Sequence, residues 1–205
     1  MRKVLLGFCA VALFAGLTFA EEKMDATSGA TTKYTANKAD LKKIVTGKKI
    51  LVVYYSLSGN TERVAKDIAE CFGADTEKLI DKKNRKGFFG FMGGGKDAMT
   101  KKLADIEPTK LDPSKYDIVV MGTPIWSWKM TPAIRTYITQ NTDKFKEVAF
   151  FLTSGSTPAE NVVPSMEELS GKKGIAYVGL NSKELKDNNK YWAKLTKFLE
   201  SFKQK

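Results

Sequence analysis

The chain has 205 residues, a formal net charge of +11 and no histidine. The length is that of one ordinary domain, and the absence of histidine excludes Ser-His triads, Cys-His dyads and most zinc sites. The excess of basic over acidic residues favours acidic partners or anionic surfaces. Because the lysines are spread along the chain, we expect no nucleic-acid binding, and we expect no metal site.

Residues 1–20 have the pattern of a secretory signal peptide. Arg2 and Lys3 precede an apolar run over residues 4–19, which is too short at its apolar centre to favour a membrane span. Ala20 gives a cleavage position before Glu21. We therefore expect export to a periplasm or extracytosolic cell surface. Cleavage would lower the charge to +9 and leave Cys71 as the only cysteine, so no internal disulfide is expected.

Residues 21–49 form a polar segment rich in Thr, Ala and Lys, with too few large apolar residues to pack, and we expect a flexible lead-in. From residue 50 the chain alternates between two apolar periodicities. The expected strands are residues 50–55, 75–80, 116–121, 147–152 and 175–180. The expected helices are residues 60–72, a piece ending near 104 after a glycine-rich segment, 132–140, 159–169 and 183–202.

The most informative stretch is the turn between the first strand and the first helix. It consists of Ser56, Leu57, Ser58, Gly59, Asn60 and Thr61. The N–H groups in the first turn of a helix are unpaired and the helix dipole is positive there, so such a turn favours an anion. No Lys or Arg lies between Tyr55 and Glu62, so a phosphate would be held by dipoles alone. The alternative is an ordinary capped helix.

Strands that alternate with helices predict a parallel sheet covered on both faces. Ligands bind to such sheets beyond the carboxyl ends of the strands, where the strand order reverses. Two further loops should lie there, over residues 122–132 and 153–158. The first contains Trp126 and Trp128, whose rings would suit a flat aromatic ligand, although one of them is expected to pack beneath the loop.

Residues 90–97 (GFMGGGKD) nearly match a nucleotide-binding P-loop. Asp97, however, occupies the position at which Ser or Thr should ligate magnesium, and no strand comes directly before the motif. We therefore expect no nucleotide triphosphate site there.

Together the three loops resemble those of the flavodoxin-like FMN-binding family, in its short-chain form, and the resemblance extends from Lys49 to about Phe202. It implies a three-layer α/β fold with a five-stranded parallel sheet of order 2-1-3-4-5, formed by residues 50–205. Its motifs are residues 56–61, 122–126 with 132–137, and 153–156. The third loop lacks the aromatic residue that many flavodoxins carry, and the chain is basic and exported where flavodoxins are usually acidic and cytoplasmic.

The resemblance implies FMN as the cofactor and assigns its site. Residues 56–61 would hold the FMN phosphate. The flavin ring would lie beside Thr123, Pro124, Ile125, Trp126, Ser127 and Trp128, with Trp126 as the best stacking candidate. Ser154, Gly155 and Ser156 would border its other side. No catalytic acid or base is assigned.

A short string in the polar segment, residues 25–31 (DATSGAT), resembles the acceptor motif of covalently flavinylated exported proteins. The resemblance implies that a dedicated FMN transferase would join FMN through its phosphate to Thr31. Nineteen residues separate Thr31 from Ile50, and fully extended they would span ~60 Å, enough to reach the crevice of the same molecule. The tethered flavin could equally be a second one beside a non-covalent FMN.

The leading functional hypothesis is an exported electron carrier that serves redox partner proteins, either membrane-bound or acidic. The alternative enzyme is an FMN-dependent quinone or flavin reductase acting outside the cytoplasm. A third hypothesis is a binding module that kept the fold and lost the flavin.

Overall fold

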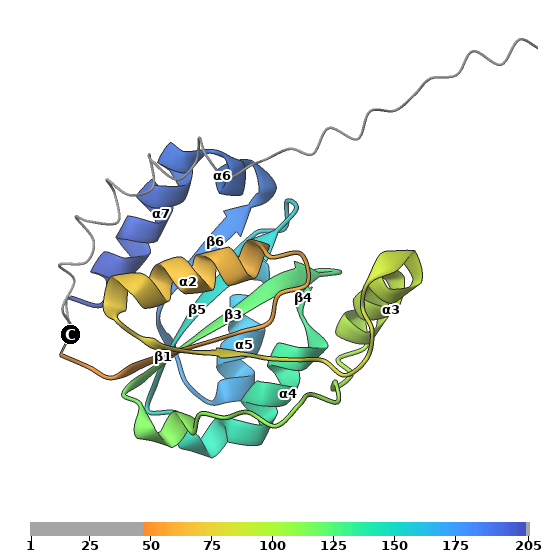
Figure 1. The fold of residues 1–205 in the computed structure, drawn as a ribbon, viewed down its shortest axis with the longest axis horizontal. Coiled ribbons are helices and arrows are strands. Elements are labelled where there is room, and N and C mark those ends of the chain that lie inside the picture. The colour runs from red at the N-terminus through yellow and green to blue at the C-terminus, as the bar shows by residue number, and fades with distance from the viewer. Residues whose placement is uncertain (1–46, 204–205) are drawn as a thin grey trace, which may run out of the picture.

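A computed structural model describes residues 47–203 of the chain (Figure 1). The expected signal peptide, the string that contains Thr31 and most of the polar segment 21–49 lie outside the described residues. The strands are β1 Ile50–Tyr54, β2 Asp75–Lys78, β3 Ile118–Trp126, β4 Lys129–Met130, β5 Glu147–Ser154 and β6 Gly174–Asn181. The helices are α2 Asn60–Phe72, α3 Gly87–Met99, α4 Pro132–Asn141, α5 Val163–Ser170, α6 Ser182–Lys186 and α7 Asn188–Glu200.

Five of the strands form a parallel sheet in the order β2-β1-β3-β5-β6. This is the order expected from the sequence, and it confirms the flavodoxin-like α/β fold. A sixth short strand, β4, pairs antiparallel with the end of β3 and was not expected. The carboxyl ends of the parallel strands meet at one edge of the sheet, and the strand order reverses beside β1.

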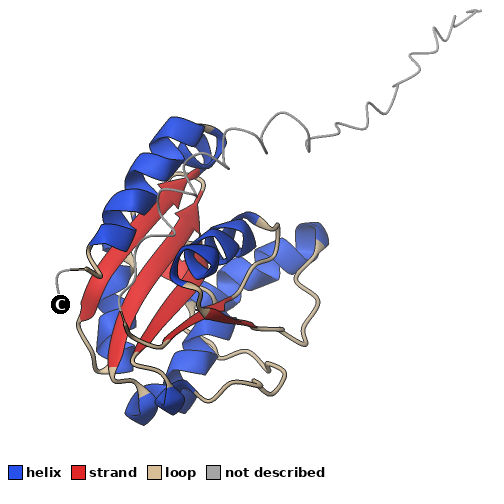
Figure 2. Cartoon of the chain, turned by 60° about the vertical axis from the view of Figure 1, so that its left-hand side comes forward, coloured by secondary structure: helices blue, strands red, loops and turns tan. Residues whose placement is uncertain are grey.

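Helices cover both faces of the sheet, as Figure 2 shows. Alternate residues of β1 belong to two separate apolar cores, because successive side chains of a strand point to opposite faces. Ile50, Val52 and Tyr54 pack with α2 and α7, whereas Leu51 and Val53 pack with α4 and α5. No helix within residues 47–203 is long and apolar enough to cross a membrane.

The sequence predicted a loop directly after the third strand, and the first half of that prediction is wrong. β3 does not end at Met121 but continues to Trp126, because its extension pairs with β5 as far as Pro124 opposite Thr153. The chain then reverses through Ser127 and Trp128, both with positive φ, into β4. The second ligand loop is therefore a β-hairpin. The expected last helix is also divided, because Asp187 ends α6 and its side chain caps α7.

The glycine-rich segment is not a loop either, since α3 includes most of it. Each glycine in a helix interior costs about 1 kcal/mol relative to alanine, so local propensity argues against this helix. Tertiary contacts compensate for that cost. A Cβ at Gly94 would lie 2.7 Å from the ring of Trp126, and one at Gly90 would lie 2.5 Å from the backbone of Arg85. The glycines let α3 approach its neighbours closely.

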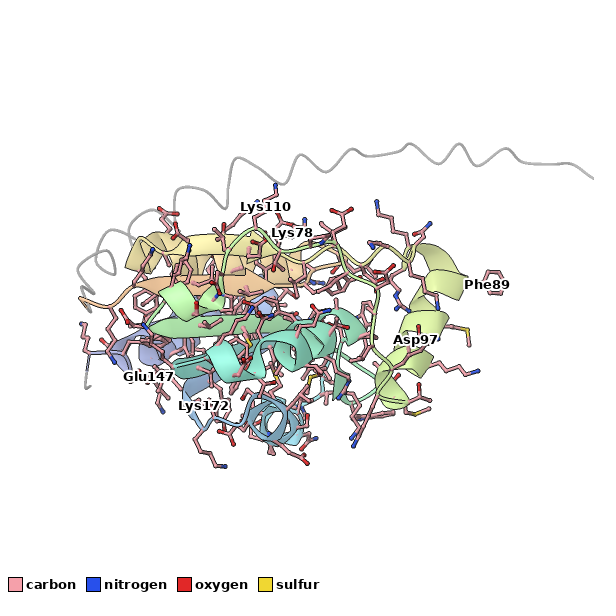
Figure 3. The ribbon with its side chains drawn as sticks, turned by 90° about the horizontal axis from the view of Figure 1, so that it is seen from below. Lys78, Phe89, Asp97, Lys110, Glu147 and Lys172 are labelled. Atoms are coloured by element: carbon pink, nitrogen blue, oxygen red, sulfur yellow. The ribbon has the colours of Figure 1, made fainter. Side chains whose placement is uncertain are left out.

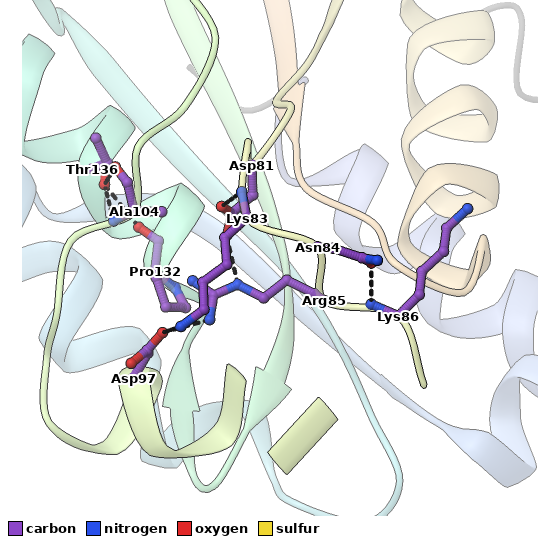
Figure 4. Close-up of polar contacts among 9 residues, drawn as sticks. All are labelled: Asp81, Lys83, Asn84, Arg85, Lys86, Asp97, Ala104, Pro132 and Thr136. Carbon is purple, nitrogen blue, oxygen red and sulfur yellow. Dashed lines mark hydrogen bonds and ion pairs between the residues drawn. The ribbon is translucent and has the colours of Figure 1, made fainter. Parts of the chain in front are cut away.

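A buried ion cluster fixes α3 to the segment that follows β2 (Figure 4). The Arg85 guanidinium donates to the carboxylates of both Asp81 and Asp97, and Lys83 also donates to Asp97, at 3.0 Å. Burial acts to raise the pKa of Asp97, but the hydrogen bonds from Arg85 and Lys83 outweigh it and hold that pKa below its ordinary value of 3.8. Asp97, the residue that spoils the P-loop pattern, is therefore part of this structural cluster.

Asp97→Asn should lower the free energy of unfolding by on the order of 3 kcal/mol, because it leaves the buried Arg85 with a single carboxylate. The stability that depends on ionised Asp97 is present above about pH 3.8 and is lost as pH falls through the lower pKa of the folded state. Urea denaturation at several pH values measures both effects. Asp105→Asn removes an exposed pair with Lys82 and should be nearly neutral. Equal losses in the two variants would contradict the assignment.

Candidate functional site

A cavity of about 540 Å³ lies at the carboxyl edge of the sheet, within the size range of small-molecule sites. All three predicted loops contribute to it. Its lining residues from those loops are Ser58, Asn60, Pro124, Ile125, Trp126, Ser127, Thr153, Ser154 and Gly155. The structure therefore brings together most of the site residues predicted from the sequence.

The first loop presents the N-terminus of α2 at this cavity. The N-cap residue is Gly59, with φ 91°, and no side chain caps the helix. In the described part of the chain, no acceptor is found for the backbone N–H groups of Asn60, Thr61 and Glu62. Ser56 accepts a hydrogen bond from the Gly59 N–H at 3.2 Å and so shapes the turn. These open N–H groups, at the positive end of the helix dipole, make this turn a candidate anion site.

Two residues of this loop do not face the cavity. Leu57 packs against the apolar core beneath. The side chain of Thr61 is buried, and its hydroxyl forms a 2.8 Å hydrogen bond with the hydroxyl of Thr153, at the end of β5. The Thr61 hydroxyl thus links the first and third loops instead of pointing outwards. A hydroxyl-rich sequence pattern cannot distinguish these two orientations.

In the second loop, some of the predicted residues line the cavity and others support the surrounding backbone. Thr123 is fully buried, and its hydroxyl accepts from the Thr131 N–H at 3.1 Å, which joins β3 to the start of α4. Trp126 lines the cavity, yet only 9% of it is exposed. Its ring packs on Gly94 and meets the ring of Tyr55 edge-on, with centroids 5.6 Å apart. Trp128, at the tip of the hairpin, is 65% exposed and does not line the cavity.

The third loop forms a small polar wall. Ser154 and Gly155 line the main cavity, while Ser156 lines a smaller neighbouring one of about 180 Å³. Ser154 donates to the carbonyl of Thr157 at 2.7 Å, and Ser182 donates to the carbonyl of Ser154 at 3.3 Å. These bonds hold the loop without any aromatic side chain.

Sequence reasoning missed the wall that α3 supplies. Met92, Gly95 and Lys96 line the cavity, as does Ser182 at the start of α6. Lys96 is the only basic residue among those that line it. The segment was interpreted as a glycine-rich connection, so nothing in the sequence placed it against the hairpin. The spacing of its small residues, Gly90, Gly94 and Ala98, was the available signal for a helix that packs closely.

The charged groups around α2 lie outside the cavity. Glu62 forms ion pairs with Lys66 and Lys78, and their hydrogen bonds lower the pKa of Glu62. Burial and the nearby Asp81 raise the pKa of Tyr55 to about 12, so Tyr55 stays neutral at physiological pH. Among the described residues no cluster of acidic or cysteine side chains could hold a metal ion. The cavity therefore combines helix N–H groups, hydroxyls, an indole and one ammonium.

A family model described as a flavodoxin domain matches residues 95–200, just over half of the chain. The chain belongs to the flavodoxin family. The matched range includes the second and third loops but not the first. A search of curated proteins found no match.

Solved structures share the flavodoxin fold at low identity. A flavoprotein from Lactobacillus acidophilus in complex with FMN is 24% identical, with 72% of this chain and 99% of that one covered and a TM-score of 0.58. A putative flavoprotein from Bacteroides uniformis is also 24% identical, with 71% and 97% covered and a TM-score of 0.56. One from Bacteroides eggerthii is 23% identical, with 71% and 98% covered and a TM-score of 0.52.

The link between the first and third loops of this flavodoxin domain can be tested with a double-mutant cycle. Thr61→Val and Thr153→Val should each lower the free energy of unfolding by about 1–2 kcal/mol, because each leaves a buried hydroxyl without its partner. The double variant should lose less than the sum, since both partners are then absent. Chemical denaturation measures all four proteins, and Thr76→Val on the exposed face of β2 serves as the control. Additive losses would show that the two hydroxyls are not coupled.

Proposed function

We propose that this flavodoxin binds FMN in the 540 Å³ cavity and acts as an electron-transfer protein outside the cytoplasm. The observation that carries the proposal is the uncapped N-terminus of α2 in the same cavity as the apolar and aromatic surface of Pro124, Ile125 and Trp126. A phosphate and a flat ring on one ligand match these two environments. FMN also fits the family, and a solved flavoprotein of this fold is an FMN complex.

The residues present fit FMN without a metal or a basic loop. The N–H groups at the start of α2 and the Ser58 hydroxyl would hold the phosphate, and Lys96 would add the single positive charge that lines the cavity. Residues 124–127 and Ser154 with Gly155 would flank the ring. Trp126 keeps its part as a stacking candidate, restricted by its contacts with Gly94 and Tyr55. FMN supplies the one- and two-electron chemistry.

The lining favours a carrier over an enzyme. Lys96 is the only titratable side chain among the residues that line the cavity, and the sequence contains no histidine. A general acid or base must lie within hydrogen-bond reach of the reacting group. The protein would therefore bind and orient the flavin and exclude water from it, while electrons pass to and from redox partner proteins. The net positive charge would speed association with acidic or membrane-bound partners.

A quinone or flavin reductase remains the second candidate, favoured by the small third loop. Ser154, Gly155, Ser156 and Thr157 form a wall with no aromatic side chain, which leaves space beside a bound ring. Sustained NAD(P)H oxidation by the FMN-loaded protein, with a quinone or free flavin as acceptor, would establish the reductase. A single stoichiometric reduction without turnover favours the carrier.

Flavin titration tests the phosphate site. The protein should bind FMN at least about tenfold more tightly than riboflavin, which lacks the phosphate. Gly59→Ala should reduce this preference, because φ 91° is strained for alanine and the turn must shift. Gly73→Ala, at the other end of α2, has a similar positive φ and open space around it, so it is the matched control. Flavin fluorescence quenching measures the affinities.

Equal affinities for FMN and riboflavin would remove the phosphate site. Absence of binding to either flavin, with the fold intact by circular dichroism, would favour the non-redox binding module. If Gly59→Ala and Gly73→Ala reduce the preference for FMN over riboflavin equally, the effect comes from protein stability and not from the phosphate site.

We further propose that an FMN transferase attaches FMN through its phosphate to Thr31 after export. The string of residues 25–31 follows an apolar segment with the pattern of a signal peptide, and it precedes a flavodoxin domain. β1 spans roughly 17 Å from Ile50 to the cavity edge. The ~60 Å reach of the nineteen residue steps from Thr31 to Ile50 exceeds this distance, so the tethered flavin could enter the same cavity.

Coexpression with an FMN transferase tests the attachment. The exported protein should gain the mass of one FMN moiety, and its yellow colour should stay with the acid-precipitated pellet. Thr31→Ala should lose both signals, whereas Thr32→Ala, the neighbouring hydroxyl, should keep them. Colour released entirely into the supernatant, or a mass gain that persists in Thr31→Ala, would exclude Thr31 as the acceptor. Neither readout depends on activity.

A further inference from the structure

Exposed apolar side chains gather at one end of the described domain. Among the side chains that the structure describes, seven large apolar ones are exposed, and five of these lie on α3, shortly after it, or at the hairpin tip. We call these five the α3 face: Phe89, Met92, Met99, Leu103 and Trp128. Phe89 is 86% exposed and projects away from the sheet (Figure 3).

The spacing along α3 places its part of this face on one side of the helix. Phe89, Met92 and Met99 follow one another at intervals of three and seven residues, and Lys96 lies between them on the same stripe. The opposite side packs on the protein, with Gly94 against Trp126 and Gly95 against Ser127. Since Trp126 and Ser127 lead directly to Trp128, the hairpin tip lies beside α3. Exposed residues distant in sequence are thus brought to the same end of the domain.

The same region is strongly basic. Residues 82–104 contain seven Lys and Arg and one acidic residue, Asp97, which is taken up by Arg85 and Lys83. The lysines with no ion pair to any described residue are Lys86, Lys96, Lys101 and Lys102. Apolar side chains ringed by uncompensated lysines are complementary to a surface with an apolar interior and an anionic layer above it.

We propose that the α3 face docks on an anionic lipid bilayer. Its side chains come from α3, from the segment after it and from the hairpin tip, and they are exposed beside lysines. A fluid interface accepts such side chains, whereas a protein partner needs a matching pocket for each anchor. Phe and Trp favour the boundary between headgroups and acyl chains, and lysines extend their ammonium groups to the phosphates.

Docking in this way would turn the cavity towards the lipid. Met92 and Lys96 belong to α3 and also line the 540 Å³ cavity, so the mouth of the cavity adjoins the docking surface. If the proposed FMN occupies that cavity, the flavin would lie close to the membrane surface. The docking itself does not depend on FMN, and it can be tested in the flavin-free protein.

Vesicle flotation with the chain of residues 21–205 tests the proposal. This chain lacks the apolar run of residues 4–19 and retains both apolar cores. It should float with phosphatidylcholine vesicles that contain phosphatidylglycerol, bind vesicles without it far less, and dissociate as salt rises. The double variant Phe89→Ser/Trp128→Ser should bind at least about tenfold more weakly. Tyr177→Ser, an exposed aromatic residue on β6, is the control and should bind as the wild type does.

A comparison of two charge-reversed variants distinguishes binding through the α3 face from general electrostatic attraction to the vesicle. Lys101→Glu/Lys102→Glu and Lys172→Glu/Lys197→Glu change the net charge equally, but only the first pair lies next to α3. The first pair should weaken binding much more. Of the three tryptophans, Trp128 alone is exposed, so brominated lipids should quench its fluorescence and Trp128→Phe should abolish that quenching.

Three outcomes would overturn the proposal. The first is absence of binding to anionic vesicles. The second is equal weakening by the two charge-reversed pairs. The third is self-association in the absence of lipid that is lost in Phe89→Ser, which would make the α3 face an interface between copies of this chain. Each outcome leaves FMN binding unaffected, so failure here is distinguishable from failure of the proposed function.

Discussion

The contact between α3 and the β3–β4 hairpin is the constraint on which the site depends. Gly94 and Gly95 allow the helix to approach Trp126 and Ser127 so closely that any side chain there would collide with them. The buried Arg85 also holds this helix, through its ion pair with Asp97. Together these contacts turn a glycine-rich segment of weak helix propensity into a rigid wall. That wall fixes the indole of Trp126 and gives the cavity its only lysine.

A second constraint acts at the start of α2. The candidate anion site there depends on the absence of a side chain that caps the helix. Most helices begin with a Ser, Thr, Asp or Asn whose side chain satisfies the first N–H groups. Here Gly59 takes that position, and the nearby Thr61 hydroxyl is engaged with Thr153. The N–H groups are therefore available to a ligand. A cradle of dipoles with little fixed charge also suits a phosphate that carries only one negative charge, as a phosphodiester to Thr31 would.

The sequence predicted the sheet well because its central strands, β1, β3 and β5, are buried on both faces and appear as short apolar runs. It failed where tertiary contacts override local preference. Residues 122–126 contain Gly122 and Pro124, which are uncommon in strands, yet they extend β3 because β5 pairs with them. The glycines of α3 likewise favour a loop by local preference, but contacts with Trp126 and Arg85 hold the segment as a helix. The inward side chain of Thr61 and the contribution of Lys96 follow from packing between distant segments, which one sequence does not encode visibly.

The two unexpected elements, α3 and the hairpin, also account for the most unusual surface of the domain. Gly94 and Ala98 lie on the inner side of α3, while Phe89, Met92 and Met99 are exposed. Burying them against the sheet would require α3 to rotate, which would break the pair between Asp97 on α3 and the buried Arg85. The ion cluster therefore holds the apolar face in solvent at a cost in hydrophobic free energy. A surface kept exposed in this way, beside the mouth of the cavity, is better explained by contact with a partner than by stability of the fold.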